Sequence, residues 1–436
     1  MEDPQMSGLY WAMVRRWFSS FFHRVWRRGV MRSGMVTGLI LAAVVGGLSL
    51  AYREQGRGHV RRIKARIEPV RTGAPEPRPG GQGALEVTRM RLLGSAMPEF
   101  LSVTVLPGRG MNVLQIGAFI PGKGEVSLLA SPPVEGAAST MTGSGADDDG
   151  QQSLAMGGAF EVPWAGRIWG VGSQAAGRLN AEWHGHAISL PGSAQAGSNG
   201  GLMLAAGADS TDTTAFPDGG EVQAVYHMGN YGAHWLSKTD VTITVLLSGR
   251  TVEFTVAARN VGDVPEPVGI GWQPRFAIFD GNREQLRLHL PCDRREEVRD
   301  RKSGLPTGTL LPVAGTAYDF TARGGVALGR MGLDDTFASL HRETIDSDPS
   351  AELTDPANGY GLRLVASSPD IKGFHVEAPA DADYVSISPQ YNYDDPFGQE
   401  WSTDNDTGMV VLQPGQSTQW KVRLEIFSLS SSQSPL

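Results

Sequence analysis

The segment Gly269–Ile278 (GIGWQPRFAI) places residues of three chemical types side by side. Trp272 and Phe276 carry aromatic rings, which stack on the apolar C–H faces of sugars. Gln273 can both donate and accept hydrogen bonds, and Arg275 can bind an anionic group or pair with an acidic residue of the chain itself. The combination favours the wall of a carbohydrate-binding cleft. For the two rings, packing in the core is the alternative.

Acidic side chains gather in two further segments. GLDDTF contains Asp334 and Asp335, and YNYDDPFGQEW contains Asp394, Asp395 and Glu400. A carboxylate can accept a hydrogen bond from a hydroxyl group or take its proton as a general base. We treat Asp394 and Glu400 as candidate catalytic residues, with solvated turn residues as the alternative.

The histidines offer less. His184 and His186 in AEWHGHAISLP are expected on a strand, and His234 and His375 are expected to be strand or core residues. No set of His, Asp and Glu has the spacing of metal ligands, so we expect neither a metal site nor a cofactor.

These side chains would be positioned by β-strands. Alternating apolar and polar residues recur in short runs such as FLSVTVLP and WKVRLEIF, and long helical patterns do not occur. In VTITVLLSGRTVEFTVAARN two such runs meet at Ser248-Gly249-Arg250, which predicts an antiparallel hairpin. The 56 glycines also favour a turn-rich β architecture. We therefore predict an all-β fold, one large antiparallel β-sandwich over residues 85–430, with residues 131–153 as a mobile surface loop.

The sequence before the sandwich suggests a membrane anchor. Residues 34–52 contain no charged side chain and would span roughly 28 Å as a helix, close to the thickness of the bilayer core. A cleaved signal peptide is the alternative. Residues 1–33 read as a basic amphipathic arm, and residues 53–84 as a basic and then Pro/Gly-rich linker. We expect a single-pass transmembrane helix with the globular domain in the periplasm.

Charge and cysteine content restrict the possible partners and the possible covalent cross-links. Residues 1–83 hold 14 Lys and Arg against 5 Asp and Glu, whereas the remainder of the chain is acidic. An acidic body argues against nucleic acid as a partner, because phosphate binding needs a basic face. Cys292 is the only cysteine, so an intrachain disulfide is impossible.

Several segments, taken in order, resemble the aldose 1-epimerase (galactose mutarotase) family. The segments are VLPGRGMNVLQIGAFIPGKGEVSLLASPP, GGAFEVPWAGRIWG, HWLSKTD, NVGDVPEPVGIGWQPRF, GLDDTFASL, VSISPQYNYDDPFGQEWSTD and DTGMVVLQPGQSTQWKVRLEIF. They extend from about Leu85 to Phe427. The resemblance implies the family's β super-sandwich and a monosaccharide or glycan as ligand, but a fold does not by itself establish an activity.

Two sugar-binding positions of the family match this chain. Arg167 in PWAGRI corresponds to the family arginine, although Gly166 replaces the usual asparagine before it. Asp334 corresponds to the sugar-binding aspartate, with Asp335 as the alternative if the register slips by one residue.

Three other family positions differ. Gln273 stands where the family has its acid histidine, Ser388 where it has its base glutamate, and Gly200 where it has a second histidine. Glutamine cannot give up a proton near neutral pH, and an unassisted serine is a poor base. The resemblance therefore predicts a sugar-binding protein whose catalysis is weak or lost. The predicted substrate-binding residues are Arg167, Asp334, Gln273, Gly200, Trp272, Arg275, Phe276, Gln390 and Tyr391.

Two alternatives remain open. The chain could be an active aldose 1-epimerase that uses Asp394 or Glu400 in a rearranged acid/base pair, each positioned group contributing about 10²–10⁴ in rate. It could also be a membrane-tethered scaffold of a sugar-processing complex.

Overall fold

The computed structural model describes residues 76–429 except residues 93, 173–176, 194–195, 343–346 and 403–405. The predicted amphipathic arm, the predicted membrane helix and the linker up to residue 75 lie outside the described residues. Among the helices that are described, none is long and apolar enough to cross a membrane.

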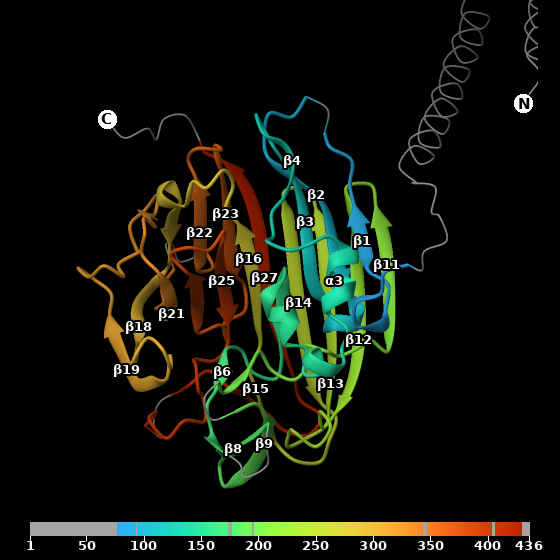
Figure 1. Cartoon of the computed structure of the whole chain (residues 1–436), viewed down its shortest axis with the longest axis vertical. Coiled ribbons are helices and arrows are strands. Elements are labelled where there is room, and N and C mark those ends of the chain that lie inside the picture. Colours follow the sequence, from blue (N-terminus) through green and yellow to red (C-terminus); the bar gives the residue numbers. More distant parts are fainter. Residues whose placement is uncertain are drawn as a thin grey trace, which may run out of the picture. The chain divides into compact units, whose positions relative to one another are not determined.

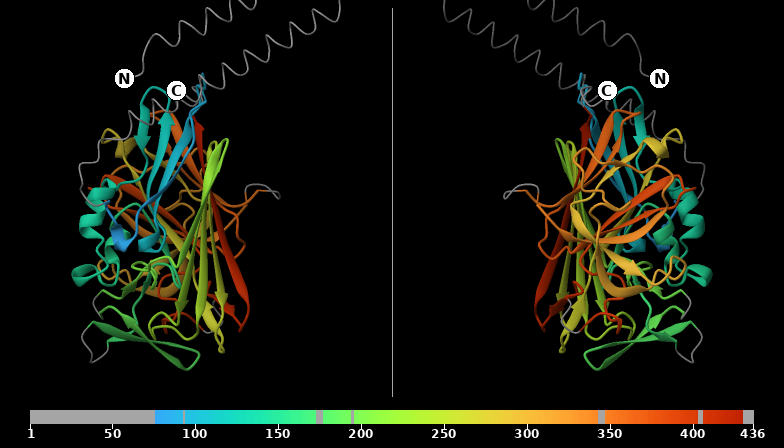
Figure 2. Two further views of the ribbon diagram at one scale, coloured as in Figure 1. Left: turned by 90° about the vertical axis from the view of Figure 1, so that its right-hand side faces the viewer. Right: turned by 90° about the vertical axis from the view of Figure 1, so that its left-hand side faces the viewer.

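Two antiparallel sheets form the body of the protein, and Figure 2 shows them edge-on as two layers. In spatial order the first sheet consists of β1 (Leu85–Thr88), β2 (Glu99–Leu106), β3 (Asn112–Ile120), β5 (Gly158–Glu161), β16 (Gly271–Ala277), β25 (Tyr384–Gln390), β24 (Gly373–Ala378), β21 (Leu333–Leu340), β18 (Cys292–Val298) and β19 (Pro306–Pro312), with β4 (Gly124–Ser127) paired to β3. The second consists of β11 (Ser210–Phe216), β12 (Gly219–Gly229), β13 (Thr239–Ser248), β14 (Thr251–Asn260), β27 (Ser417–Ser428), β23 (Tyr360–Ala366), β22 (Ser350–Asp355), β17 (Arg287–His289) and β20 (Val326–Ala327).

Smaller elements complete the fold (Figure 1). The short sheets pair β6 (Arg167–Ile168) with β10 (Ser198–Asn199), β15 (Glu266–Val268) with β26 (Val410–Leu412), and β8 (Arg178–Trp183) with both β7 (Val171–Gly172) and β9 (His186–Pro191). The helical elements are η1 (Pro79–Gly81), η2 (Pro107–Arg109), α3 (Val134–Thr140), η3 (Gly145–Asp147), η4 (Gln151–Ala155) and η5 (Arg283–Gln285). The predicted all-β architecture is confirmed.

The predicted hairpin is also confirmed. β13 and β14 pair antiparallel from Thr239–Asn260 down to Ser248–Thr251, with Gly249 and Arg250 at the turn. Both strands alternate between buried and partly exposed residues along most of their length. This period of two buries one face of the sheet and leaves the other face more open.

The core between the two layers is rich in aromatic residues. Trp272 of β16 lies 4.2 Å from Phe254 of β14, measured between ring centroids, and Phe160 of β5 lies 6.3 Å from Trp420 of β27. Each contact joins one sheet to the other, so these rings hold the layers together.

The predicted cleft aromatics Trp272, Phe276 and Tyr391 all belong to this core and are at most 1% exposed. The prediction that they form a binding wall was wrong. Trp272 and Phe276 alternate along β16 with Gln273 and Arg275, so the two pairs point to opposite faces of the sheet.

Residues 131–153 do not form the loop that we predicted. They contain α3, η3 and most of η4, and α3 packs through Ala137 against Leu106 and Leu114 of the first sheet. Figure 1 and Figure 2 show these helices on the outside of that sheet, away from the second one.

Arg109 fastens this helical segment to the body. Its buried guanidinium donates hydrogen bonds to both carboxylate oxygens of Asp147, at 2.7 and 2.9 Å, and to the carbonyl oxygen of Gly150 and the hydroxyl of Ser153. Paired and bonded in this way, the guanidinium can be buried without the large penalty of an isolated charge.

Residues 76–84, which we assigned to the linker, pack against the same region. Gly80 has a φ of 64°, and a Cβ there would lie only 1.9 Å from the Gly108 carbonyl oxygen. A glycine is therefore needed at position 80 for the backbone to approach Gly108 this closely. The Gly80 backbone N–H also donates a hydrogen bond to the Met141 carbonyl oxygen.

Asp147→Ala should lower the free energy of unfolding by about 3–5 kcal/mol, because it leaves the buried Arg109 charge without a partner. Urea unfolding measures the change. The exposed neighbour Asp148 supplies the control: Asp148→Ala should change the unfolding free energy by less than about 0.5 kcal/mol. Equal stability of the two variants would contradict the role given to Arg109.

Candidate functional site

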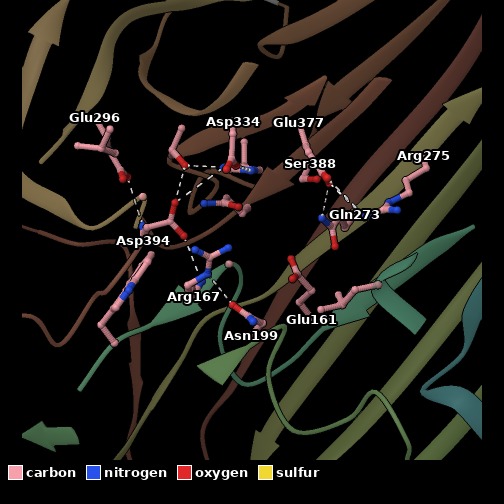
Figure 3. Close-up of a pocket in the computed structure, with 18 residues that line it drawn as sticks. Glu161, Arg167, Asn199, Gln273, Arg275, Glu296, Asp334, Glu377, Ser388 and Asp394 are labelled. Carbon is pink, nitrogen blue, oxygen red and sulfur yellow. Dashed lines mark hydrogen bonds and ion pairs between the residues drawn. The ribbon is translucent and has the colours of Figure 1, made fainter. Parts of the chain in front are cut away.

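A polar pocket opens on the outer face of the first sheet, with a cavity of about 220 Å³ (Figure 3). The lining side chains come from β5, β6, β10, β16, β18, β21, β24, β25 and the loops beside them. The lining residues are Leu154, Glu161, Gly166, Arg167, Trp169, Asn199, Gln273, Arg275, Glu296, Val298, Gly304, Asp334, Thr336, His375, Glu377, Ser388, Gln390 and Asp394.

Strand alternation explains which residues reach the pocket. On β24, Phe374, Val376 and Ala378 are buried in the core, whereas His375 and Glu377 line the pocket. The same period of two turns Gln273 and Arg275 of β16, and Ser388 and Gln390 of β25, toward the pocket and the residues between them toward the second sheet.

His375 lies at the centre of the charged groups. Its Nε2 is 3.2 Å from Oδ1 of Asp334, and its Nδ1 is 2.9 Å from Oγ1 of Thr336 and 3.8 Å from Oδ2 of Asp394. The Thr336 hydroxyl in turn donates to Oδ2 of Asp394 at 3.1 Å. Two carboxylates and one hydroxyl therefore hold the imidazole ring in place.

These contacts set the charge of the ring. Burial alone disfavours the imidazolium, but the hydrogen bond to Asp334 and the charges of Asp394, Asp334 and Glu377 outweigh it and raise the pKa of His375 to about 9. The hydrogen bond from His375 lowers the pKa of Asp334 to about 2 against the opposing effect of burial. At neutral pH the pair is an imidazolium and a carboxylate.

Asp394 joins the charged centre to the loop that holds Arg167. Its Oδ1 accepts a hydrogen bond from the Arg167 backbone N–H at 3.1 Å. Gly166, with a φ of 68°, makes room for this carboxylate, because a Cβ there would lie 2.3 Å from the same oxygen. The glycine that replaces the family's asparagine is thus required by the position of Asp394.

Arg167 faces the pocket from β6. Its Nε donates to Oδ1 of Asn199 at 2.7 Å, its Nη1 donates to the Ser303 carbonyl, and its guanidinium lies 4.8 Å from the centre of the Trp169 ring. Of the described residues, none places a carboxylate within ion-pairing distance of this cation. Its charge is therefore free to attract ligand oxygens.

Glu377 forms a second charged group with Arg275. The Arg275 guanidinium lies 3.4 Å from Oε2 of Glu377 and 4.4 Å from the centre of the Tyr384 ring. Glu377 also accepts hydrogen bonds from the Tyr384 hydroxyl and from Nε2 of Gln273. Arg275 thus pairs with an acidic residue of the chain itself, which was one of the two roles that we expected for it.

Two buried glutamates complete the titratable groups. Burial raises the pKa of Glu161 to about 8, although His375 and the Gly166 backbone N–H act in the opposite direction. Burial and the nearby charge of Asp394 raise the pKa of Glu296 well above its usual range. Glu161 is therefore mainly a neutral acid at pH 7.

Two of the three positions that differ from the family pattern, Gln273 and Ser388, lie between these groups. Ser388 of β25 pairs with His375 of β24 in the strand register, and its hydroxyl contacts the hydroxyl of Ser386. Gln273 and Gln390 each bury an Oε1 atom that has no hydrogen-bond partner among the described residues. These two amide oxygens can accept hydrogen bonds from a ligand.

The structure brings together seven of the residues selected from the sequence and leaves others outside. The pocket includes Arg167, Asp334, Gln273, Arg275, Ser388, Gln390 and Asp394. Gly200, Trp272, Phe276, Tyr391 and Glu400 do not line it.

Glu400 and Asp335 have structural partners instead. Glu400 is hydrogen-bonded to Asp395, whose pKa burial and Glu400 raise to about 7. Asp335 forms ion pairs with Arg295 and Arg301. Glu400 is therefore placed outside the pocket, and of the two adjacent aspartates it is Asp334 that lines the cavity.

Sequence reasoning missed His375, Glu161, Glu377 and Thr336. We had assigned His375 to a strand or to the core. The alternation in GFHVEA contained the missing signal, because buried Phe374 and Val376 require His375 to point the other way. In the described part of the chain, no group of His, Cys, Asp and Glu side chains is arranged to hold a metal ion.

Comparison with known proteins gives a consistent result. The family model described as aldose 1-epimerase matches residues 142–425. No curated protein has a sequence that matches the chain. Solved structures with a similar fold include a galactose mutarotase-like protein from Clostridium acetobutylicum, at 15% identity and a TM-score of 0.62, which covers 79% of this chain and 98% of that one.

Two further solved structures share the fold. An aldose epimerase homologue from C. elegans is 14% identical, with a TM-score of 0.57, covering 80% of this chain and 99% of that one. Galactose 1-epimerase from Lactobacillus acidophilus NCFM is 17% identical, with a TM-score of 0.55. The match covers 79% of this chain and 99% of that one. At these identities the likeness concerns the fold alone.

The imidazole of His375 should stay protonated through neutral pH and titrate near pH 9, because its folded pKa lies above the ordinary value of about 6.5. The stability that protonation of His375 contributes is complete at pH values below about 6.5 and is lost as the pH rises through 9, whereas the contribution of the Asp334 carboxylate is lost as the pH falls through about 2. NMR of the imidazole C–H signals measures this, with His375→Gln identifying the resonance. Asp334→Asn should lower the pKa of His375 by at least about 1; an unchanged value would show that the ion pair does not form.

Proposed function

Because the chain belongs to the aldose 1-epimerase family, we propose that its pocket binds an aldose in the pyranose form. A pyranose presents several hydroxyl groups that both donate and accept hydrogen bonds. The proposal is supported above all by one observation. Arg167, which has no carboxylate within ion-pairing distance among the described residues, and the Asp334 carboxylate line the same cavity as Gln273 and Gln390, whose buried Oε1 atoms have no hydrogen-bond partner among those residues.

Each of these groups suits one kind of contact. The Arg167 guanidinium offers donors to ring or hydroxyl oxygens, and Asp334, whose side chain is 55% exposed, has a second oxygen that can accept from a hydroxyl group. The Gln273 and Gln390 oxygens accept from further hydroxyls. Because a buried acceptor without a donor costs free energy, a ligand that supplies the donor is favoured.

Interconversion of α and β anomers is the second candidate function. We reasoned from Gln273 and Ser388 that proton carriers were absent, yet Glu161, His375 and Glu377 stand beside those two positions. Ring opening needs a group that protonates the ring oxygen and a group that takes the proton of the anomeric hydroxyl. Ionisable side chains in the same cavity favour activity over binding alone.

Arg167→Ala and Asp334→Asn should each weaken pyranose binding by about 10- to 100-fold, the effect of losing one charge-assisted hydrogen bond. Isothermal titration of the full chain with glucose, galactose and their methyl glycosides measures the affinity. Arg330 is exposed and does not line the pocket, so Arg330→Ala is the matched control and should bind pyranoses as the wild type does. If the wild type binds no pyranose, the proposal fails and the scaffold alternative gains support.

We propose from the sequence of residues 1–52 that the chain is anchored in a membrane by residues 34–52 with its sandwich in the periplasm. Residence of the full chain in the membrane fraction after a carbonate wash is expected. Release by that wash would refute the anchor.

A further inference from the structure

We propose that the Glu161 carboxyl group by itself exchanges both protons of pyranose ring opening, replacing the two separate carriers that Gln273 and Ser388 cannot supply. The inference rests on the proposed function, since it requires an aldopyranose in the pocket. It concerns how the pocket acts and which residue does so.

Glu161 reaches the pocket beside Gly271, which has no side chain to block it. It ends β5, where it pairs with Gly271 of β16, and Gly271 pairs on its other side with Gln390 of β25. A Cβ at Gly271 would lie 2.7 Å from Cβ of Ala165, 3.1 Å from Oε2 of Glu161 and 3.4 Å from Cβ of Gln390. The carboxyl group of Glu161 and the Ala165 side chain therefore both approach β16 where the glycine lacks a side chain.

Figure 3 shows the direction of approach. The side chains of Glu161 and Gln273 enter from one side of the pocket, and those of Arg167 and Asp394 enter from the other. A sugar held by Arg167 would consequently meet the Glu161 carboxyl across the cavity.

The other carboxyl groups of the pocket already have protein partners. Asp334 is paired with His375, Asp394 accepts from Thr336 and from a backbone N–H, and Glu377 accepts from Tyr384 and Gln273. Glu296 accepts from the Asp394 backbone N–H. No described side chain donates a hydrogen bond to Glu161, and the donor that acts on its carboxyl group is the Gly166 backbone N–H. The protonated carboxyl group therefore keeps its O–H and a carbonyl lone pair for a ligand.

The surroundings keep Glu161 in the acid form. The residue is 4% exposed, and burial is the main cause that raises its pKa to about 8. His375 of β24 opposes the shift, whereas Glu377 of the same strand and Asp394 favour it. The remaining charged or titratable groups that line the cavity are Arg167, Arg275, Glu296 and Asp334.

A neutral carboxyl group can complete the reaction without a second residue. Its O–H gives a proton to the ring oxygen O5 as the C1–O5 bond breaks, and the electron pair of that bond stays on O5. Its carbonyl oxygen takes the proton of the O1 hydroxyl, and the released O–H electron pair forms the C1=O1 double bond. The carboxyl remains neutral, with its proton now on the other oxygen.

The reverse step completes the exchange. Rotation about C1–C2 turns the other face of the aldehyde toward O5, which attacks C1. The O5 hydroxyl returns its proton to the carboxyl, and the carboxyl gives its own to O1, so the ring closes as the opposite anomer. The geometry suits this, because the donor and acceptor are two oxygens on one carbon both in the carboxyl group and at C1 of the sugar.

Glu161→Gln tests the proposal, since an amide keeps the size of the side chain but does not exchange protons in this way. Polarimetry of α-glucose and α-galactose should show that the wild type accelerates mutarotation over buffer. The variant should lose at least about 100-fold in kcat, with KM changed by only a few-fold. Glu135→Gln, on the exposed side of α3, should match the wild type.

The pH profile of the wild type supplies a second readout that needs no variant. Because the acid form is the active one, kcat/KM should be constant below about pH 7 and fall as the pH rises through about 8. If Glu161 had only a structural role, its ionisation would not cause this fall in activity near pH 8.

The outcomes separate this inference from the proposed function. Sugar binding without acceleration by the wild type overturns the inference and leaves the binding function standing. Full activity in Glu161→Gln, or a kcat/KM that rises through pH 8, also overturns it. Absence of any sugar binding overturns both. Loss of kcat in a Glu161→Gln protein that still binds sugar and unfolds at the wild-type temperature supports it.

Discussion

The strands of the first sheet present alternate residues to opposite faces, and both the core and the pocket depend on that alternation. On β16, Trp272 and Phe276 face the second sheet while Gln273 and Arg275 face the pocket. A shift of one residue in register would place polar groups in the core and aromatic rings in the cavity. The aromatic contacts between the layers oppose such a shift, and so the packing of the core fixes the geometry of the pocket on the other face.

The charge of the pocket is arranged around His375. As an imidazolium it balances Asp334 and, through Thr336, orients Asp394, which in turn holds the backbone at Arg167. Removing one partner of this partly buried network leaves an uncompensated charge, which is why the members act as a unit. The same burial that strengthens these contacts raises the pKa of both Glu161 and Glu296.

Two missing side chains shape the space between these groups. A Cβ at Gly166 would collide with the Asp394 carboxylate, and a Cβ at Gly271 would collide with the Ala165 side chain and crowd the Glu161 carboxyl group. The helical segment that Arg109 fastens outside the first sheet extends through η4, and Leu154 of η4 forms part of the pocket wall. An apparently low-complexity stretch of sequence is therefore part of the structure that bounds the site.

Local patterns in the sequence determined the strands, the hairpin at Ser248–Thr251 and the family, because these depend on neighbouring residues and on ordered motifs. They also led to Arg167 and Asp334, which do line the pocket. Trp272 was misplaced although its alternation with Gln273 was visible, since an aromatic ring suits a sugar cleft and a core equally well. Only the tertiary structure brought Glu161 and His375, more than 200 residues apart in the chain, into one cavity. Their protonation depends on burial and on charges from distant strands, and neither quantity exists until the chain has folded.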